Sequence, residues 1–188
     1  LLQFSLIFSA LIHDADHAGV SNEQLAEEVP DLARLYKGRL IAEQHSVDLA
    51  WELLMHPCYS DLQRCIFSTS SELKRFRQIV VNLVLATDFA DKEMSGIRTL
   101  RWNEAFLSSV EVVSQGGESR AKLAIVKELR VQLADVSHTM QAWHVYLQWN
   151  KHMFLEEYEA YRSGRSDLDP SKVWFVRQIF LFDNHCIP

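Results

Sequence analysis

Helix breakers and strand patterns are scarce in this sequence. It has six glycines and four prolines among 188 residues, and the alternation of apolar and polar residues that marks half-buried strands is nearly absent. Apolar residues recur instead at helical spacing, and the 48% of hydrophobic residues is enough for one substantial core. The sequence therefore predicts an all-α fold, a multi-helix bundle that forms a single domain over residues 1–188.

Cysteine and positive charge are also scarce. The three cysteines (Cys58, Cys65 and Cys186) are odd in number and have no CxxC or zinc-finger spacing, which fits reduced thiols in the cytoplasm better than a disulfide framework. The formal net charge of −6 leaves no basic stripe for a nucleic-acid backbone, so we expect no nucleic-acid partner. A small phosphate ester stays open as a substrate, because a bound metal can supply positive charge locally.

Long hydrophobic runs are missing as well. The most apolar segment, residues 1–12, is too short to span a bilayer and lacks the charged flank and the cleavage site of a signal peptide. We interpret it as a buried helix and expect no direct membrane contact from this chain. Because the sequence starts inside an apolar helical pattern, we expect a fragment whose upstream part is missing.

Helical periodicity and capping signals divide the chain into nine predicted helices. They cover residues 1–13, 22–28, 31–36, 39–56, 70–88, 97–113, 119–136, 141–163 and 170–185. Three helix starts carry N-cap signals: Ser21 with Gln24, Thr69 with Glu72, and Asp169 before Pro170. Residues 115–118 and 163–166 are the clearest predicted loops.

The chemistry concentrates directly behind the apolar segment. His13, Asp14, Asp16 and His17 fall within five positions, and imidazole and carboxylate beside a buried helix need a partner that a divalent cation supplies. His13 and His17 share a face of a continuous helix, which favours a metal site over the alternative that His13 and Asp14 only cap the helix.

A metal site also needs ligands from elsewhere in the chain. The best distant candidate is Asp135, a carboxylate in an apolar helical run, although such a residue alone could be half-exposed and paired with a neighbour. His138, one turn later, is expected beside the site or on the surface rather than on the metal.

Four segments resemble, in order, the motifs of the class I 3′,5′-cyclic nucleotide phosphodiesterase catalytic domain. Residues 10–22 read Ala-Leu-Ile-His-Asp-Ala-Asp-His-Ala-Gly-Val-Ser-Asn and are similar to H-D-x-D-H-P-G-x-x-N, with Ala18 in place of the proline. Glu43-Gln44-His45-Ser46 is similar to E-x-H-H, Leu85-Ala86-Thr87-Asp88 matches L-A-T-D, and Ala134-Asp135-Val136-Ser137 matches A-D-L-S. The resemblance covers nearly all of the chain and implies an all-helical fold of the HD type with two metal ions.

The resemblance implies a role for each matched residue. It makes His13, Asp14 and Asp135 metal ligands, with Asp14 bridging the two ions. Mixed nitrogen and oxygen ligands suit Zn²⁺ at the first site, and a bridging carboxylate with waters suits Mg²⁺ or Mn²⁺ at the second. His17, Glu43 and Thr87 would hold the second ion's waters or the bridging hydroxide. From the residues alone, Glu43 could instead pair with Arg39 on the surface, and Thr87 with Asp88 could be the polar end of an apolar run.

The C-terminal segment resembles the base-binding helix of the same family. Gln178 stands at the glutamine that binds the purine, and the resemblance places Leu181 and Asp135 with it at the substrate site. Two departures concern stacking, since Phe180 replaces a glycine and Leu181 replaces an aromatic clamp. Core packing is the competing interpretation for Phe180, Leu181 or Phe182.

One family motif, H-N-x-x-H, has no counterpart in the sequence. It supplies the proton donor for the leaving group and a further zinc ligand, so two hypotheses follow. The first is hydrolysis of cAMP or cGMP to the 5′-monophosphate, and the alternative is a non-catalytic remnant that binds nucleotide or metal or acts as an interaction module. A third, an HD phosphohydrolase acting on another nucleotide, accounts for fewer motifs. The sequence carries no signal for an oligomeric state.

Residues 101–106 and 135–141 also resemble cyclase-associated phosphodiesterases of unicellular eukaryotes. This resemblance is compatible with a membrane-tethered parent protein whose tether lies outside the sequence.

Overall fold

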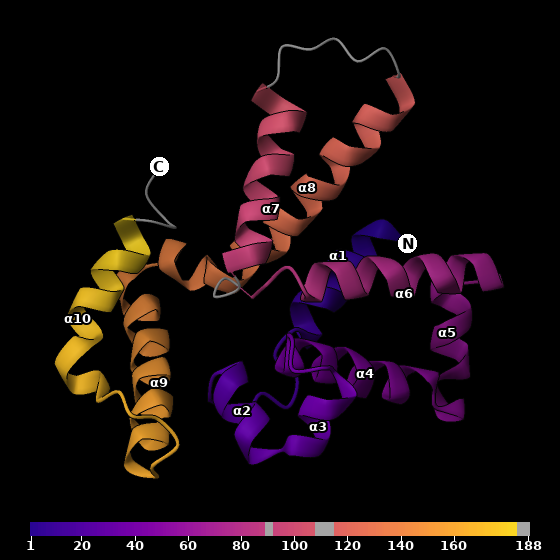
Figure 1. Ribbon diagram of the computed structural model, residues 1–188. Helices are drawn as coiled ribbons and strands as arrows, with labels where there is room; N and C mark the ends of the chain where they lie inside the picture. The colour runs from indigo at the N-terminus through magenta and orange to yellow at the C-terminus, as the bar shows by residue number, and fades with distance from the viewer. Residues whose placement is uncertain (89–91, 108–114, 184–188) are drawn as a thin grey trace. The chain divides into compact units, whose positions relative to one another are not determined.

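The computed structural model describes residues 1–88, 92–107 and 115–183, and it is helical throughout with no strand in those ranges (Figure 1). The α-helices are α1 (Leu2–Ile12), α2 (Asn22–Glu28), α3 (Pro30–Leu35), α4 (Ile41–Met55), α5 (Ser60–Ile66), α6 (Ser70–Val84), α7 (Lys92–Trp102), α8 (Gln115–Asp135), α9 (Trp143–Arg162) and α10 (Pro170–Leu181). Short 3₁₀ turns cover Pro57–Tyr59 and Val136–Met140, and a π turn covers Asn103–Leu107. The predicted all-α class is confirmed.

The described chain divides into two compact units. One unit contains residues 1–16 and 42–135, and the other contains residues 17–41 and those from 136 onward. The prediction of a single domain stays a prediction. No helix among the described residues is long and apolar enough to cross a membrane.

The first unit packs around Phe76, which is completely buried on α6. The rings of Phe4, Phe8, Trp51 and Phe67 lie 5.7 to 6.2 Å from the Phe76 ring, centroid to centroid. Aromatic pairs at such distances add about 0.5–1.5 kcal/mol each beyond the burial of their area. This cluster joins α1, α4 and α6, and so fixes the end of α1 where His13 follows.

Helix α1 is buried on one face only, so the prediction of a buried helix over residues 1–12 is wrong for its other face. The buried positions are Ser5, Ser9 and Ile12, whereas Ile7 and Leu11 are 69% and 78% exposed. Helix α1 packs against α6 and α8, and small buried serines allow such close packing of helices.

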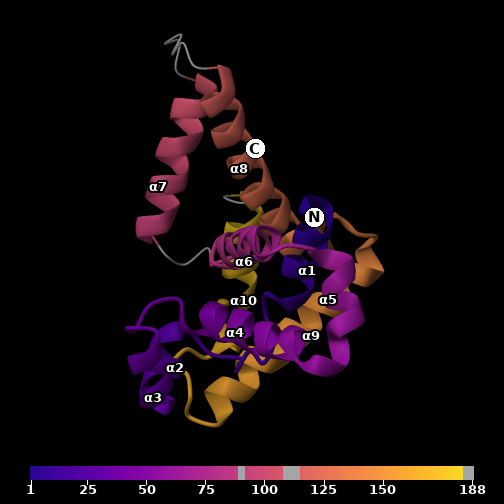
Figure 2. The same ribbon diagram turned by 90° about the vertical axis from the view of Figure 1, so that its right-hand side faces the viewer.

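In the second unit, α9 lies beside α10 (Figure 1) and α2 lies beside α3 (Figure 2). Aromatic side chains pack between α9 and α10. Phe154 meets Trp174 edge-on at 5.3 Å, and Tyr146 meets Phe182 at 5.7 Å. Arg165, after α9, donates through Nε and Nη2 to both carboxylate oxygens of Glu28 and through Nη1 to the Ala18 carbonyl. This guanidinium ties the start of the unit to its C-terminal part.

All three predicted N-caps are confirmed. Ser21 Oγ accepts from the Gln24 amide, Thr69 Oγ1 accepts from the Glu72 amide, and Asp169 Oδ1 accepts from the Ser171 amide. Several other boundaries are wrong: α6 ends at Val84 rather than 88, α7 begins at Lys92, and α5 was not predicted. The loop predicted at 115–118 is the first turn of α8. Residues 108–113 and 184–185 of two predicted helices lie outside the described residues.

Candidate metal and nucleotide site

The end of α1 presents His13. This residue is the C-cap of α1, and its Nδ1 lies 2.9 Å from the Ala10 carbonyl oxygen. A carbonyl only accepts, so Nδ1 carries a proton and donates it, which directs Nε2 away from the helix. A histidine held through Nδ1 to a backbone carbonyl is the usual arrangement of a histidine metal ligand.

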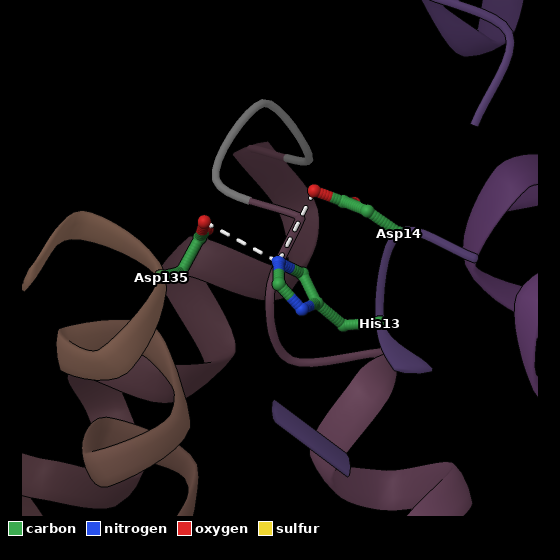
Figure 3. Close-up of side chains that lie close together, drawn as sticks. All are labelled: His13, Asp14 and Asp135. Atoms are coloured by element: carbon green, nitrogen blue, oxygen red, sulfur yellow. Dashed lines mark hydrogen bonds and ion pairs between the residues drawn. The ribbon is translucent and has the colours of Figure 1, made fainter. Parts of the chain in front are cut away.

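Two carboxylates converge on that nitrogen. Nε2 of His13 lies 3.2 Å from Oδ2 of Asp14 and 3.3 Å from Oδ1 of Asp135 (Figure 3). The three side chains each offer one ligand atom, and these atoms lie within 4.8 Å of one another. Asp135 is 122 residues from His13 in sequence, so the fold brings together the predicted ligand trio.

The electrostatics of the trio favour a cation. The hydrogen bonds to Asp135 and Asp14 outweigh desolvation and raise the pKa of His13 to about 10. Asp135 is the last residue of α8, and a carboxylate at a helix C-terminus is unfavourable with the helix dipole unless a positive partner offsets it. One nitrogen and two carboxylate oxygens also match the ligand preferences of zinc and of other divalent ions.

Helix α4 holds the loop that follows His13. Asp16 has a left-handed backbone (φ 61°), and its Oδ2 lies 2.9 Å from Nε2 of His45. The Ser46 hydroxyl donates to the Ala15 carbonyl at 2.8 Å. Sequence reasoning assigned no role to His45 or Ser46, although both stand in the segment similar to E-x-H-H. Glu43, half-buried in the first turn of α4, begins that segment.

Thr87 lies just after α6 and is 7% exposed. Its hydroxyl donates to the Val84 carbonyl at 2.7 Å. Because its one proton is engaged, Oγ1 can act toward any further partner only as an acceptor. Water bound to a metal ion is a strong donor, so this hydroxyl has the polarity that such a water needs.

His17 belongs to the second unit. The Gly19 amide donates to its Nδ1 at 3.2 Å, so Nδ1 is unprotonated and the proton of a neutral ring sits on Nε2. Gly19 has φ 70°, and a Cβ there would come within 3.1 Å of Cγ of Glu156. The left-handed backbone and this close side chain favour glycine at the position, and its amide sets the tautomer of His17.

Gln178, also in the second unit, has a defined amide orientation. The Trp174 indole can only donate, and it donates to Oδ1 of Asn150 at 3.0 Å. The Asn150 amide nitrogen therefore donates to Oε1 of Gln178 at 2.7 Å, and the Tyr146 hydroxyl donates to the same oxygen at 3.0 Å. With its oxygen used by two donors, Gln178 offers the Nε2 amide hydrogens to a ligand.

The apolar residues beside Gln178 differ in environment. Phe180 is 60% exposed, whereas Leu181 is half-buried as the last residue of α10. Phe182 is half-buried and packs against Tyr146, and its core-packing interpretation stays a prediction.

Comparison with known proteins places these residues in a family. The model of the 3′,5′-cyclic nucleotide phosphodiesterase family matches residues 1–177. The chain belongs to this family. The match includes every proposed metal ligand and ends one residue before Gln178.

Curated phosphodiesterases show the same relationship. The chain is 30% identical over 162 residues to a probable 3′,5′-cyclic-AMP phosphodiesterase of Caenorhabditis elegans, an alignment that covers 81% of this chain and 22% of that protein. It is 30% identical over 170 residues to the 3′,5′-cyclic-AMP phosphodiesterase 4C of Rattus norvegicus, covering 88% of this chain and 30% of the relative. The chain thus spans less than a third of the length of these phosphodiesterases.

A solved phosphodiesterase domain shares the fold. The domain of the Salpingoeca rosetta rhodopsin phosphodiesterase superposes with a TM-score of 0.69 at 20% identity, over 86% of this chain and 46% of that domain. Within the phosphodiesterase family, Ala18 stands where the resemblance leads us to expect proline, and its carbonyl accepts from Arg165.

Proposed function

We propose that the protein to which this chain belongs hydrolyses a 3′,5′-cyclic nucleotide, cAMP or cGMP, to the 5′-nucleoside monophosphate with two divalent ions. The observation that carries the proposal is the convergence of His13, Asp14 and Asp135 on one point. Family membership supports the reaction class, and the ligand trio supports metal dependence.

Each residue of the proposed site would have a distinct role in the reaction. His13, Asp14 and Asp135 would hold the ions, Zn²⁺ at the first site and Mg²⁺ or Mn²⁺ at the second, with Asp14 shared between them. The ions, when bound, polarise the phosphate and lower the pKa of a water that attacks phosphorus. Thr87 and Glu43 would each accept a hydrogen bond from a water of the second ion, and His17 would donate through Nε2 to such a water or to the hydroxide.

Gln178 would orient the base. Its Nε2 hydrogens need an acceptor, and both purines have acceptors on their edges, N7 in each and O6 in guanine. A single donor contact of this kind suits cAMP as well as cGMP. Leu181 would supply aliphatic contact to the face of the base.

The test combines metal content and turnover in matched variants. Asp14→Asn should remove bound Zn²⁺ and Mn²⁺ and abolish hydrolysis of cAMP and cGMP, because a shared ligand is lost. Asp61→Asn, which changes an exposed aspartate paired with Arg64 on α5, should leave both unchanged. Metal bound without turnover by the unmodified chain would favour the non-catalytic binding module. Turnover retained by Asp14→Asn would contradict the metal assignment.

A further inference from the structure

The segment after α6 is held by side chains from two other helices. Arg98 on α7 donates through Nη1 to the Ala86 carbonyl at 2.7 Å and through Nη2 to the Asp88 carbonyl at 2.9 Å. Gln132 on α8 donates through Nε2 to the same Ala86 carbonyl at 2.7 Å. The two carbonyls flank Thr87, so Arg98 brackets the peptide that carries the Thr87 hydroxyl.

The contacts have the geometry of a rigid clamp. A guanidinium presents its donors in a fixed planar fork, so two hydrogen bonds to carbonyls on both sides of one residue restrict that residue's position and rotation. The Ala86 oxygen accepts from both Arg98 and Gln132, which uses both of its lone pairs. Positive charge just beyond α6 is also favourable with the C-terminal end of that helix's dipole.

The clamp connects Thr87 to the helix of a proposed metal ligand. Gln132 lies three residues before Asp135 on α8, about one helical turn away. A second arginine on α7 provides a control for the contacts of Arg98. Arg101, also on α7, forms a two-pronged ion pair with Glu128 on α8, at 3.1 and 3.2 Å, and so links the same helices through side chains alone.

We propose that Arg98 and Gln132 are positioning residues that fix Thr87 relative to Asp135, so that the Thr87 hydroxyl can accept from a metal-bound water. The inference rests on the proposed function, because it assigns Arg98 and Gln132 to the site where Thr87 would act. Neither residue belongs to a motif by which the sequence resembles its family.

The test measures Mn²⁺ binding to the full chain by calorimetry and electron paramagnetic resonance. Arg98→Met should weaken Mn²⁺ binding about tenfold, the lower end of the effect of partners outside the ligand shell. Arg101→Met removes an α7–α8 contact of similar size without touching the carbonyls that flank Thr87, and should change the affinity less than twofold. Arg98→Lys, which keeps the charge and loses the fork, should rescue little of the loss.

A double-mutant cycle tests the route through Thr87. Thr87→Val should itself weaken Mn²⁺ binding, and Arg98→Met should add nothing in that background, because residues that act through one another are not additive. Additive effects would overturn the proposal, as would equal effects of Arg98→Met and Arg101→Met.

Two further results separate this proposal from the proposed function. If the unmodified chain binds no Mn²⁺, the proposed function and this inference both fail. If it binds Mn²⁺ in an Asp14-dependent way but Arg98→Met matches Arg101→Met, only the positioning role fails. Should Arg98→Met not fold, Gln132→Met decides, with a loss of affinity at unchanged circular dichroism supporting the clamp and an unchanged affinity overturning it.

Discussion

Groups that can only donate or only accept set the orientation of the ambiguous side chains in both units. The Ala10 carbonyl assigns the proton of His13 to Nδ1, and the Gly19 amide assigns that of His17 to Nε2. The Trp174 indole orients Asn150, which in turn orients Gln178. Each assignment follows from a backbone or indole group whose polarity is fixed, so substitutions that reverse a polarity have predictable effects.

Asn150→Asp should reverse the amide of Gln178. One carboxylate oxygen of the new aspartate would accept from Trp174, and the other would face Gln178. Because that oxygen only accepts, Gln178 would turn its Nε2 toward residue 150 and its Oε1 toward the base. Because the N6 amino group of adenine donates and O6 of guanine accepts, the cAMP to cGMP ratio of kcat/KM should rise by about tenfold, the value of one hydrogen bond. Asn82→Asp on the surface of α6 is the matched control. An unchanged ratio would remove Gln178 from base recognition.

The Arg165 contact makes stability depend on pH. Its hydrogen bonds lower the pKa of Glu28 below the usual 4.5, so the ionised carboxylate stabilises the native state above that pH and loses its effect as pH falls through the native pKa. Glu28→Gln should therefore lower the free energy of unfolding at pH 7, and the difference should shrink toward pH 3. Urea unfolding at both pH values measures this. Glu27→Gln, at an exposed position on the same helix, should change stability by less than about 0.5 kcal/mol.

At the scale of helices, the three starts with an N-cap signal were predicted correctly, and most predicted ends lie within one residue of the observed ends, whereas the largest errors fall at the end of α6, the starts of α7 and α8, and the whole of α5. Ser21, Thr69 and Asp169 act within one turn of themselves, so a local pattern is enough to find the helices that they cap. After α6 ends at Val84, the Ala86 carbonyl accepts from Arg98 and Gln132, which lie 12 and 46 residues further along the chain, and no local pattern predicts such contacts. Helix α5 begins after the Pro57–Tyr59 turn and is only seven residues long, too short for a clear period.

The proposed site likewise contains residues that local sequence patterns identify and residues that only long-range contacts bring together. His13 and Asp14 are adjacent in sequence and were found from their own pattern, whereas Asp135 was proposed from the combination of an apolar run and the family resemblance. The contacts of His45 with Asp16 and of Ser46 with Ala15 join segments about thirty residues apart, and no local spacing predicts them. The network around Gln178 likewise requires α9 and α10 to be packed together.

The buried face of α1 contains a hydroxyl without a hydrogen bond among the described residues. The Ser9 hydroxyl is buried and makes no hydrogen bond among the described residues, whereas the Ser5 hydroxyl donates to the Leu1 carbonyl at 2.9 Å. An unsatisfied buried hydroxyl costs about 1–3 kcal/mol, and alanine is also the better helix former. Ser9→Ala should raise the free energy of unfolding by about 1 kcal/mol, measured by urea denaturation.

Ser5→Ala is the control for that gain, because it removes a satisfied hydroxyl of the same size on the same face. It should be neutral or slightly destabilising. A loss of stability in Ser9→Ala would mean that the Ser9 hydroxyl does have a partner in solution.

On the scale of the whole molecule, the proposed metal would connect the first and the last helix of the first unit. His13 and Asp14 follow the first helix, while Asp135 closes α8, and the contact between them spans 122 residues. A ligand that binds only the native state stabilises it by mass action, by about 2.7 kcal/mol at a concentration one hundred times its Kd. Metal binding should therefore protect that unit against unfolding as a whole.

Removal of the metal tests this prediction. Treatment with EDTA should lower the Tm of the chain, and Mn²⁺ or Zn²⁺ should restore it in proportion to the logarithm of the ion concentration. Asp14→Asn should have a low Tm that no longer responds to either ion, whereas Asp61→Asn should respond as the unmodified chain does. Because the net charge of −6 also attracts divalent ions weakly and without specificity, the decisive quantity is the difference between these two variants at one ion concentration. Equal Tm shifts in both would assign the stabilisation to the general charge and not to the trio of His13, Asp14 and Asp135.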